Sequence, residues 1–217
     1  MTGGAGQAPQ TEGVRKVGEK DTGVWQEGGL GRIRALLEDD PRLVEHVVSE
    51  TKVWDGRIFG VRKLEVELPD GSHGVRELVL HHGGAGVAAV RDGRICLVRQ
   101  YRVAMGRMSL EIPAGKLEVG EDPERCAARE LREETGLVAG RLEFVGRAAG
   151  SIGFTNETTS IYLAHCLRQG EASPDEDEFV DVVWLPVRDV LEAVRAGLIQ
   201  DGKTIIGALA AVERGLA

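Results

Sequence analysis

The spacing of hydrophobic and polar residues divides the chain into strand-like and helix-like segments. In residues 57–68, for example, Leu64, Val66 and Leu68 alternate with charged residues, which is the pattern of a half-exposed strand. Eight segments have strand-like patterns: 47–54, 57–68, 75–81, 86–90, 94–101, 142–147, 158–165 and 180–185. Helices are predicted at 30–44, 187–196 and 201–213. Turn sequences at 69–72 and 91–93 separate neighbouring strands.

The most informative stretch is 115–137, which we interpret as a loop followed by a short acidic helix. Asp122 is suited to the N-cap, Pro123 to the first helical position and Gly136 to the C-terminal exit. Glu130 and Glu134 are four residues apart, so their carboxylates project from one face of the helix. A narrow apolar stripe that could dock on a sheet consists of Ala127, Ala128 and Leu131.

Two interpretations explain why carboxylates crowd this helix. Like charges four residues apart cost a helix roughly 0.2–0.5 kcal/mol per pair, so a cation is expected to offset the repulsion. In one interpretation Arg125, Arg129 and Arg132 form salt bridges on a solvated face. In the other the carboxylates hold a hard divalent cation, since Mg²⁺ binds through a few carboxylates, waters and substrate phosphates. Spacing alone leaves both open.

The composition indicates which classes of partner and which compartment to expect. The net charge is −8 without a basic cluster, which argues against nucleic acid as the main partner. No apolar run is long enough to span a membrane, and the first residues lack a secretory pattern, so a cytoplasmic protein is expected. We interpret Cys96, Cys126 and Cys166 as reduced, buried thiols, because they are unclustered and lie in apolar or helical contexts.

The full pattern of the acidic stretch resembles the Nudix box. The match covers 23 of the 217 residues and includes Gly115, Glu121, Arg129-Glu130-Leu131, Glu133-Glu134 and Gly136-Leu137 at the family's spacing. The resemblance implies an α/β fold, a Nudix α/β/α sandwich with a mixed sheet, preceded here by antiparallel strands. It also implies hydrolysis, dependent on Mg²⁺ or Mn²⁺, of a nucleoside diphosphate linked to another group.

Flanking motifs resemble the ADP-ribose pyrophosphatase group. They are Gln-Tyr-Arg at 100–102, Glu-Ile-Pro-Ala-Gly at 111–115, Gly-Phe-Thr-Asn-Glu at 153–157, and an acidic loop before Val-Trp-Leu-Pro at 183–186. This similarity implies that ADP-ribose is hydrolysed to AMP and ribose 5-phosphate. The chain departs from the group at Ile152, where proline usually follows the loop serine, and other nucleotide sugars remain alternatives.

The resemblance also implies roles for individual residues. Metal ligands are expected to be Glu130, Glu134, Glu178 and the carbonyl of Ala114. We expect Glu176 to act as the base, Glu133 to ligate metal or orient water, and Arg129 to orient the box carboxylates. The substrate-binding candidates are Arg102, Glu111 and Trp54. Residues 175–178 could instead be a solvated acidic loop, Arg102 a solvated strand end, and Trp54 a core residue.

The expected organisation is a flexible tail at 1–30, a helix and antiparallel sheet at 31–82, and a Nudix catalytic domain at 83–217. A small sheet alone buries little apolar surface, so two copies are expected to cover each other in a homodimer. Two further hypotheses are a non-catalytic Nudix module that binds a nucleotide sugar and regulates a partner, and an interaction scaffold without metal.

Overall fold

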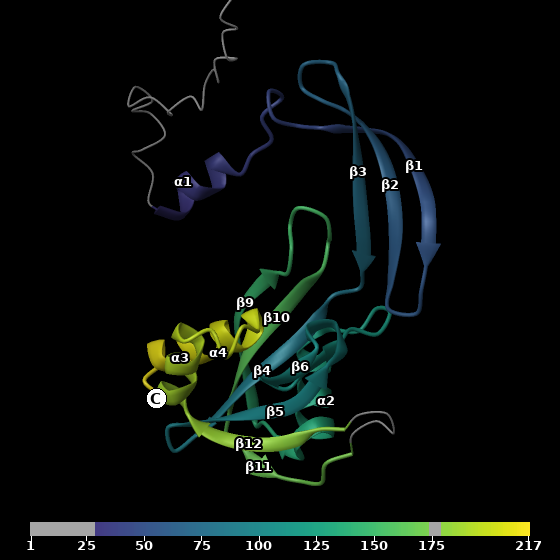
Figure 1. The fold of residues 1–217 in the computed structure, drawn as a ribbon. Helices are drawn as coiled ribbons and strands as arrows, with labels where there is room; N and C mark the ends of the chain where they lie inside the picture. The colour runs from purple at the N-terminus through teal and green to yellow at the C-terminus, as the bar shows by residue number, and fades with distance from the viewer. Residues whose placement is uncertain (1–28, 174–178) are drawn as a thin grey trace, which may run out of the picture. The chain divides into compact units, whose positions relative to one another are not determined.

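The computed structural model describes residues 29–173 and 179–217 (Figure 1). The chain divides into two compact units. The described part of the smaller unit is 29–46 with 67–72, and the larger unit is 47–66 with 73–217. The smaller unit contains helix α1, Gly29–Leu36, in which no residue is buried. This helix is shorter than the predicted 30–44. The acidic run Glu38-Asp39-Asp40 is unfavourable at the negative end of a helix, and Pro41 disfavours helical geometry in Asp40.

The remaining elements follow in chain order, and the hairpin turn after β4 has the backbone that its sequence predicts. Asp92 and Gly93 both have positive φ, 51° and 72°, as expected for an Asp-Gly hairpin turn. The strands are β1 His46–Asp55, β2 Phe59–Glu67, β3 His73–His81, β4 Gly84–Arg91, β5 Arg94–Arg102, β6 Arg107–Glu111, β7 Ala114–Lys116, β8 Leu137–Val138, β9 Arg141–Ala149, β10 Thr158–His165, β11 Arg168–Gln169 and β12 Asp181–Pro186. The helices after α1 are a short 3-10 turn η2 Val103–Met105, α2 Pro123–Thr135, α3 Val187–Arg195 and α4 Gly202–Glu213. None of the described helices is both long and apolar enough to cross a bilayer.

A three-stranded sheet in the order β1-β2-β3 is separate from the main sheet, as the sequence predicts. Every residue of β1 is exposed, whereas β2 alternates and buries Val66. The last strand of this sheet contacts the 151–157 loop, because the N–H of Val79 donates to the carbonyl of Phe154 at 2.7 Å. The N–H of His81 donates to Oδ1 of Asn156 at 2.8 Å. These contacts connect the end of β3 to the main body of the larger unit.

The main sheet has seven strands and is mixed, which confirms the predicted fold class. Its central path is β12-β5-β4-β10-β9, with β6 added to β5 and β7 added to β4. Strands β4 and β10 are parallel, and the other pairs for which a register is given are antiparallel. Strand β4 therefore lies at the centre, and its first residues pair with β7 at the start of the acidic stretch.

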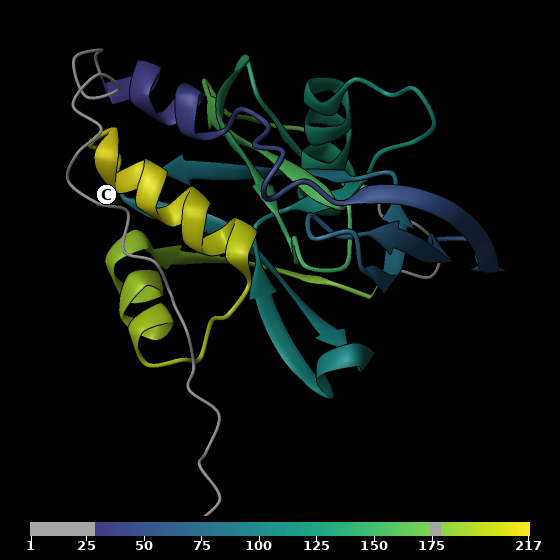
Figure 2. The same ribbon diagram turned by 90° about the horizontal axis from the view of Figure 1, so that it is seen from above.

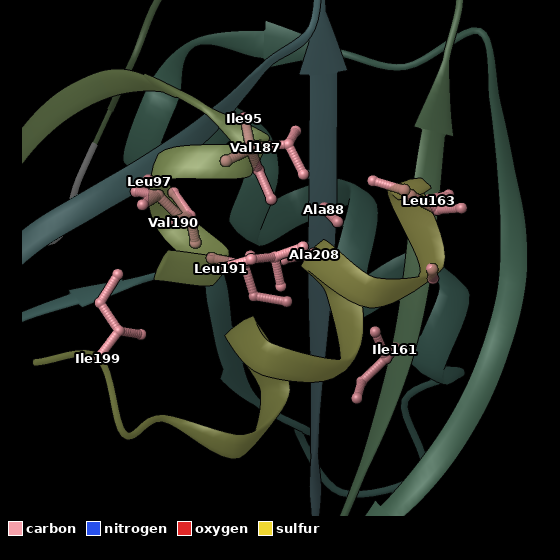
Figure 3. Close-up of a cluster of buried hydrophobic side chains, with 13 residues drawn as sticks. Ala88, Ile95, Leu97, Ile161, Leu163, Val187, Val190, Leu191, Ile199 and Ala208 are labelled. Carbon is pink, nitrogen blue, oxygen red and sulfur yellow. The ribbon is translucent and has the colours of Figure 1, made fainter. Parts of the chain in front are cut away.

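Both faces of the main sheet are buried under helices (Figure 2). Alternate residues of the central strands point to opposite faces because side chains alternate along a strand. On one face Ala88, Ile95 and Leu163 pack with Val187 and Val190 of α3 and with small residues of α4 (Figure 3). On the other face the sheet packs against α2 through Cys126, Ala127 and Leu131. This is the α/β/α sandwich that the resemblance implied.

Two details of the sequence interpretation are wrong. Ala128 is exposed, and Cys126 replaces it in the apolar stripe of α2, because the helix turns its 126–127 side toward the sheet. Cys166 is exposed, unlike the buried Cys96 and Cys126, because it occupies a tight turn after β10 with a positive φ of 55°. Burial raises the pKa of both the Cys96 and Cys126 thiols to about 12.

Candidate active site

Helix α2 begins and ends as its sequence predicts. Oδ1 of Asp122 accepts hydrogen bonds from the N–H groups of Glu124 and Arg125, and Gly136 ends the helix with a left-handed φ of 72°. Fixed caps and the docked apolar stripe together set the rotation of the helix. Glu130 and Glu134 consequently face inward and are 8% and 5% exposed, although both are acidic.

The two inward carboxylates lie against consecutive residues of β7. Oε2 of Glu134 accepts a hydrogen bond from the N–H of Ala114 at 3.0 Å. The carboxylate of Glu130 fills the space that a side chain at Gly115 would need, since a Cβ there would lie 1.9 Å from Oε1. Glycine at 115 is therefore required by the close approach of the helix carboxylate. The predicted ligands Ala114, Glu130 and Glu134 are thus brought together.

Arg129 binds three of the carboxylates around this point. Its Nε and Nη2 each donate to Glu121 at 3.0 Å, and its Nη1 donates to Glu130 at 2.7 Å and to Glu133 at 3.0 Å. The hydrogen bonds that Arg129 donates to Glu121 lower the pKa of Glu121 to about 2 and raise the pKa of Arg129. One guanidinium thus orients three carboxylates, so this cluster keeps a negative charge.

A second ion pair lies at the end of β5, where the sequence predicted a substrate contact. Arg102 donates from Nε and Nη2 to the two oxygens of Glu111, at 2.7 and 2.8 Å. Burial opposes ionisation of Glu111, but the hydrogen bonds from Arg102 and the charge of Lys203 outweigh it and lower the pKa to about 2. Glu111 is therefore an anion held between two cations.

The two ion pairs border adjoining cavities. A cleft of about 730 Å³ is lined by Arg102, Arg129, Glu130 and Glu133, together with Arg57 and Ile58 in the turn between β1 and β2. A cavity of about 390 Å³ is lined by Arg102, Lys203, Ala114 and Glu134, and by residues shared with the cleft. The lining therefore combines carboxylates with the cationic side chains Arg57, Arg102, Arg129, Lys116 and Lys203.

The donor set fits a hard divalent cation. Carboxylate oxygens are ligands that Mg²⁺ prefers, and Mg²⁺ completes its shell with water and phosphate rather than an all-protein cage. Within 29–173 and 179–217, no group of three or more His, Cys, Asp or Glu side chains is arranged so that it could hold a metal ion by itself. Arg129 pairs with three of these carboxylates, those of Glu121, Glu130 and Glu133.

The structure separates Trp54 from the other predicted site residues. Trp54 is 50% exposed, packs its ring over Gly56 and lies 5.3 Å from the ring of Phe59, but it does not line either cavity described above. Glu176 and Glu178 lie outside the described residues. The described ends of their segment do reach the site: the N–H of Ser173 donates to the carbonyl of Glu133 at 3.0 Å, and Phe179 lines the cleft.

Sequence reasoning missed Arg57, His81 and Lys203 as lining residues. His81 lines both cavities, and its Nδ1 accepts the N–H of Gly83 at 2.9 Å, so the neutral ring carries its proton on Nε2 and can donate there. Lys203 follows an N-cap residue in the sequence, but only the fold brings it to Glu111.

Comparison with known proteins agrees with the geometry. Residues 80–205 match the NUDIX domain model. The chain is 39% identical over 165 residues to the methanol dehydrogenase activator of Bacillus methanolicus and, over the same length, 39% identical to the ADP-ribose pyrophosphatase of Bacillus subtilis (strain 168). Each alignment covers 75% of this chain and 89% of the relative. The crystal structure of an ADP compounds hydrolase has the same fold, with a TM-score of 0.69 at 20% identity over 80% of this chain and 96% of that one. With the acidic helix, its capped ends and the mixed sheet all in place, the chain belongs to the NUDIX family.

Proposed function

We propose that this protein hydrolyses the diphosphate bond of nucleoside diphosphate sugars, with ADP-ribose as the preferred substrate. The observation that carries the proposal is the pair of buried carboxylates, Glu130 and Glu134, held against β7 beside a cationic cleft. Water attacks one phosphorus, the bond to the bridging oxygen breaks, and AMP and ribose 5-phosphate leave. The relative named ADP-ribose pyrophosphatase supports this choice of substrate.

Glu130, Glu134 and the carbonyl of Ala114 would hold the divalent cations, with Mg²⁺ as the expected ion and Mn²⁺ as a substitute. Such ions polarise phosphoryl oxygens and lower the pKa of bound water. Arg129 keeps Glu130 and Glu133 oriented through its hydrogen bonds at 2.7 and 3.0 Å. This arrangement supplies fixed acceptors at the cleft before substrate arrives.

Arg102 would bind the diphosphate. A guanidinium has five N–H donors and Arg102 uses two of its nitrogens on Glu111, so further donors remain for phosphoryl oxygens. Glu176 is proposed as the base and Glu178 as a further metal ligand. Their assignment is supported by the two described ends of the acidic segment: Ser173 donates to the carbonyl of Glu133, and Phe179 lines the cleft.

The test is an assay of a panel of nucleoside diphosphate sugars with the wild-type protein and Glu134→Gln. The substitution keeps the shape of the side chain and removes a metal-binding charge, so turnover should fall on the order of 10³-fold or more. Glu124→Gln, an exposed position in the first turn of α2, is the matched control and should retain turnover. Near-normal turnover of Glu134→Gln at saturating Mg²⁺ would rule out the metal assignment.

A regulatory role is the second candidate, because a relative of equal identity is named an activator of another enzyme. A protein that only regulates would bind a nucleotide sugar without turning it over. The same panel separates the two functions: calorimetric binding with no product would favour the regulator, whereas product formation sensitive to Glu134→Gln favours the hydrolase.

The protein is proposed to act as a homodimer in the cytoplasm. Strand β1 is exposed on both faces, and it presents Val47, Val48, Val53 and Trp54 along a sheet edge, where unpaired strands readily find a partner. All three cysteines lie in the described residues and are free thiols, which supports a reducing compartment. Light scattering should give twice the mass of one chain; a fully active monomer would exclude the dimer.

A further inference from the structure

Glu111 is the centre of an ion network behind the cleft. Its side chain is only 6% exposed and accepts four hydrogen bonds: Nε and Nη2 of Arg102 at 2.7 and 2.8 Å, Oγ of Ser109 at 2.5 Å, and Nζ of Lys203 at 2.6 Å. A carboxylate has about four lone-pair sites, so this acceptor is saturated within the chain. Glu111 therefore acts on a ligand only through the side chains that it binds, Arg102 among them.

Lys203 is fixed in this network by the first turn of α4. Its Nζ also donates to Oδ1 of Asp201 at 2.8 Å, and Asp201 is the N-cap that accepts the N–H of Thr204 at 3.0 Å. The fully buried hydroxyl of Thr204 donates to Asp201 and accepts the N–H of Ile112 at 2.8 Å. The helix start thus holds two consecutive residues of the segment leading into β7, Glu111 through a charge and Ile112 through its backbone.

The two cations that bind Glu111 differ in solvent exposure, which suggests that they have different roles. The side chain of Arg102 is 43% exposed and lines the cleft, whereas that of Lys203 is 17% exposed and lines the adjoining cavity but not the cleft. Without Lys203, the buried carboxylate would have Arg102 as its one cationic partner. A phosphate approaching Arg102 would then compete for that guanidinium with a buried anion that has no second cation, and losing a partner from a buried charge is costly.

We propose that Lys203 is a positioning residue for substrate binding, which neutralises Glu111 so that Arg102 can present its remaining donors to the diphosphate. The proposal rests on the proposed function, in which Arg102 meets the diphosphate. It gives the first turn of α4, which is distant in sequence from the acidic box, a role in substrate binding. Lys203 itself touches Glu111 and Asp201 and acts through them.

The experiment compares Lys203→Met with Lys203→Arg and with the exposed control Arg188→Met, using steady-state kinetics on ADP-ribose. Methionine keeps the length of the side chain and removes the charge, so KM should rise about tenfold or more, as expected for losing a charged hydrogen bond. The value of kcat should stay within about threefold, because ground state and transition state lose the same binding. Lys203→Arg should restore KM, and Arg188→Met should match the wild type. A fall in kcat at unchanged KM, or no rescue by arginine, would overturn the positioning role.

A double-mutant cycle with Glu111→Gln shows whether Lys203 acts through Glu111. In the Glu111→Gln background, Lys203→Met should change KM by less than about twofold, because the anion it neutralises is gone. An undiminished tenfold effect there would mean that Lys203 contacts the substrate directly, and would overturn the proposal.

The same cycle is measured as the calorimetric Kd for the methylene-bridged, non-hydrolysable analogue of ADP-ribose. If the wild type binds the analogue without hydrolysing ADP-ribose, the proposed function fails while the coupling between Lys203 and Glu111 is still decided by Kd. If turnover is normal and the two substitutions are additive in both measurements, only the positioning role fails. Absence of both turnover and binding would overturn the two together.

Discussion

A single methyl group at Gly115 should test the metal site without disturbing the fold. The Cβ of Gly115→Ala would lie 1.9 Å from Oε1 and 2.1 Å from Cδ of Glu130, whereas such contacts are essentially never closer than 3.0 Å. The carboxylate must therefore move by more than 1 Å. The backbone of Gly115 does not have a positive φ, so alanine is not strained by its own geometry. Glu130 ends in a flexible side chain, so the displacement costs about 0.5–1.5 kcal/mol in rotamer strain.

Displacing a reacting or ligating group by about 1 Å costs on the order of 10²-fold in rate. We therefore expect Gly115→Ala to lose about two orders of magnitude in turnover and to bind Mg²⁺ more weakly by calorimetry. Its melting temperature should fall by only about 2–4 °C per kcal/mol of strain. Gly146→Ala is the matched control, because a Cβ there has no atom within 4 Å. Wild-type metal affinity in Gly115→Ala would refute the close packing of Glu130 on β7.

Two further predictions concern stability. Glu111 has a folded pKa of about 2 against an ordinary 4.5, so its ionised form stabilises the fold by on the order of 3 kcal/mol above pH 4.5, and this contribution is lost as the pH falls toward 2. In urea unfolding, Glu111→Gln should be less stable than the wild type at pH 7, and the difference in unfolding free energy should shrink below pH 4.5. A difference that does not depend on pH would contradict this prediction. A Cβ on Gly207 would lie 2.9 Å from that of Ala88, so Gly207→Ala should lose roughly 1–3 kcal/mol in denaturant unfolding through overpacking between α4 and the sheet. Gly202→Ala has open space around its Cβ and should not lose stability. Equal losses of unfolding free energy in the two variants would contradict this packing argument.

The sequence predicts the acidic helix well because its determinants are local. Asp122, Pro123 and Gly136 are capping residues whose preferences do not depend on the rest of the fold, and the spacing of Glu130 and Glu134 fixes their common face. The pattern left open whether arginine or metal balances the carboxylates. The structure shows the contribution of arginine, since Arg129 binds three carboxylates, and the contribution of a metal is our proposal.

Contacts between distant segments could not be predicted from the sequence. Lys203 reaches Glu111 across 92 positions, and nothing in its neighbourhood distinguishes it from a lysine in the first turn of any helix. Trp54 was a candidate for substrate binding, but its ring covers Gly56 within the same hairpin. In each case the partner is decided by packing, which periodicity and propensity do not encode.

The parallel pairing of β4 with β10 affects how the protein folds during its synthesis. The ladder joins Gly84 to Thr159 and Ala89 to Ala164, so every rung connects residues 75 positions apart, and α2 lies in the intervening loop. Closing a loop of that length costs roughly 4 kcal/mol in chain entropy from the logarithmic term alone, and such non-local pairing is slow to form. During synthesis the ribosome therefore releases a complete acidic box long before the strand that secures its support. A nascent chain ending before Thr158 carries every residue of the box and exposes the apolar edge of β4. This enzyme therefore needs its last third both for activity and to prevent aggregation.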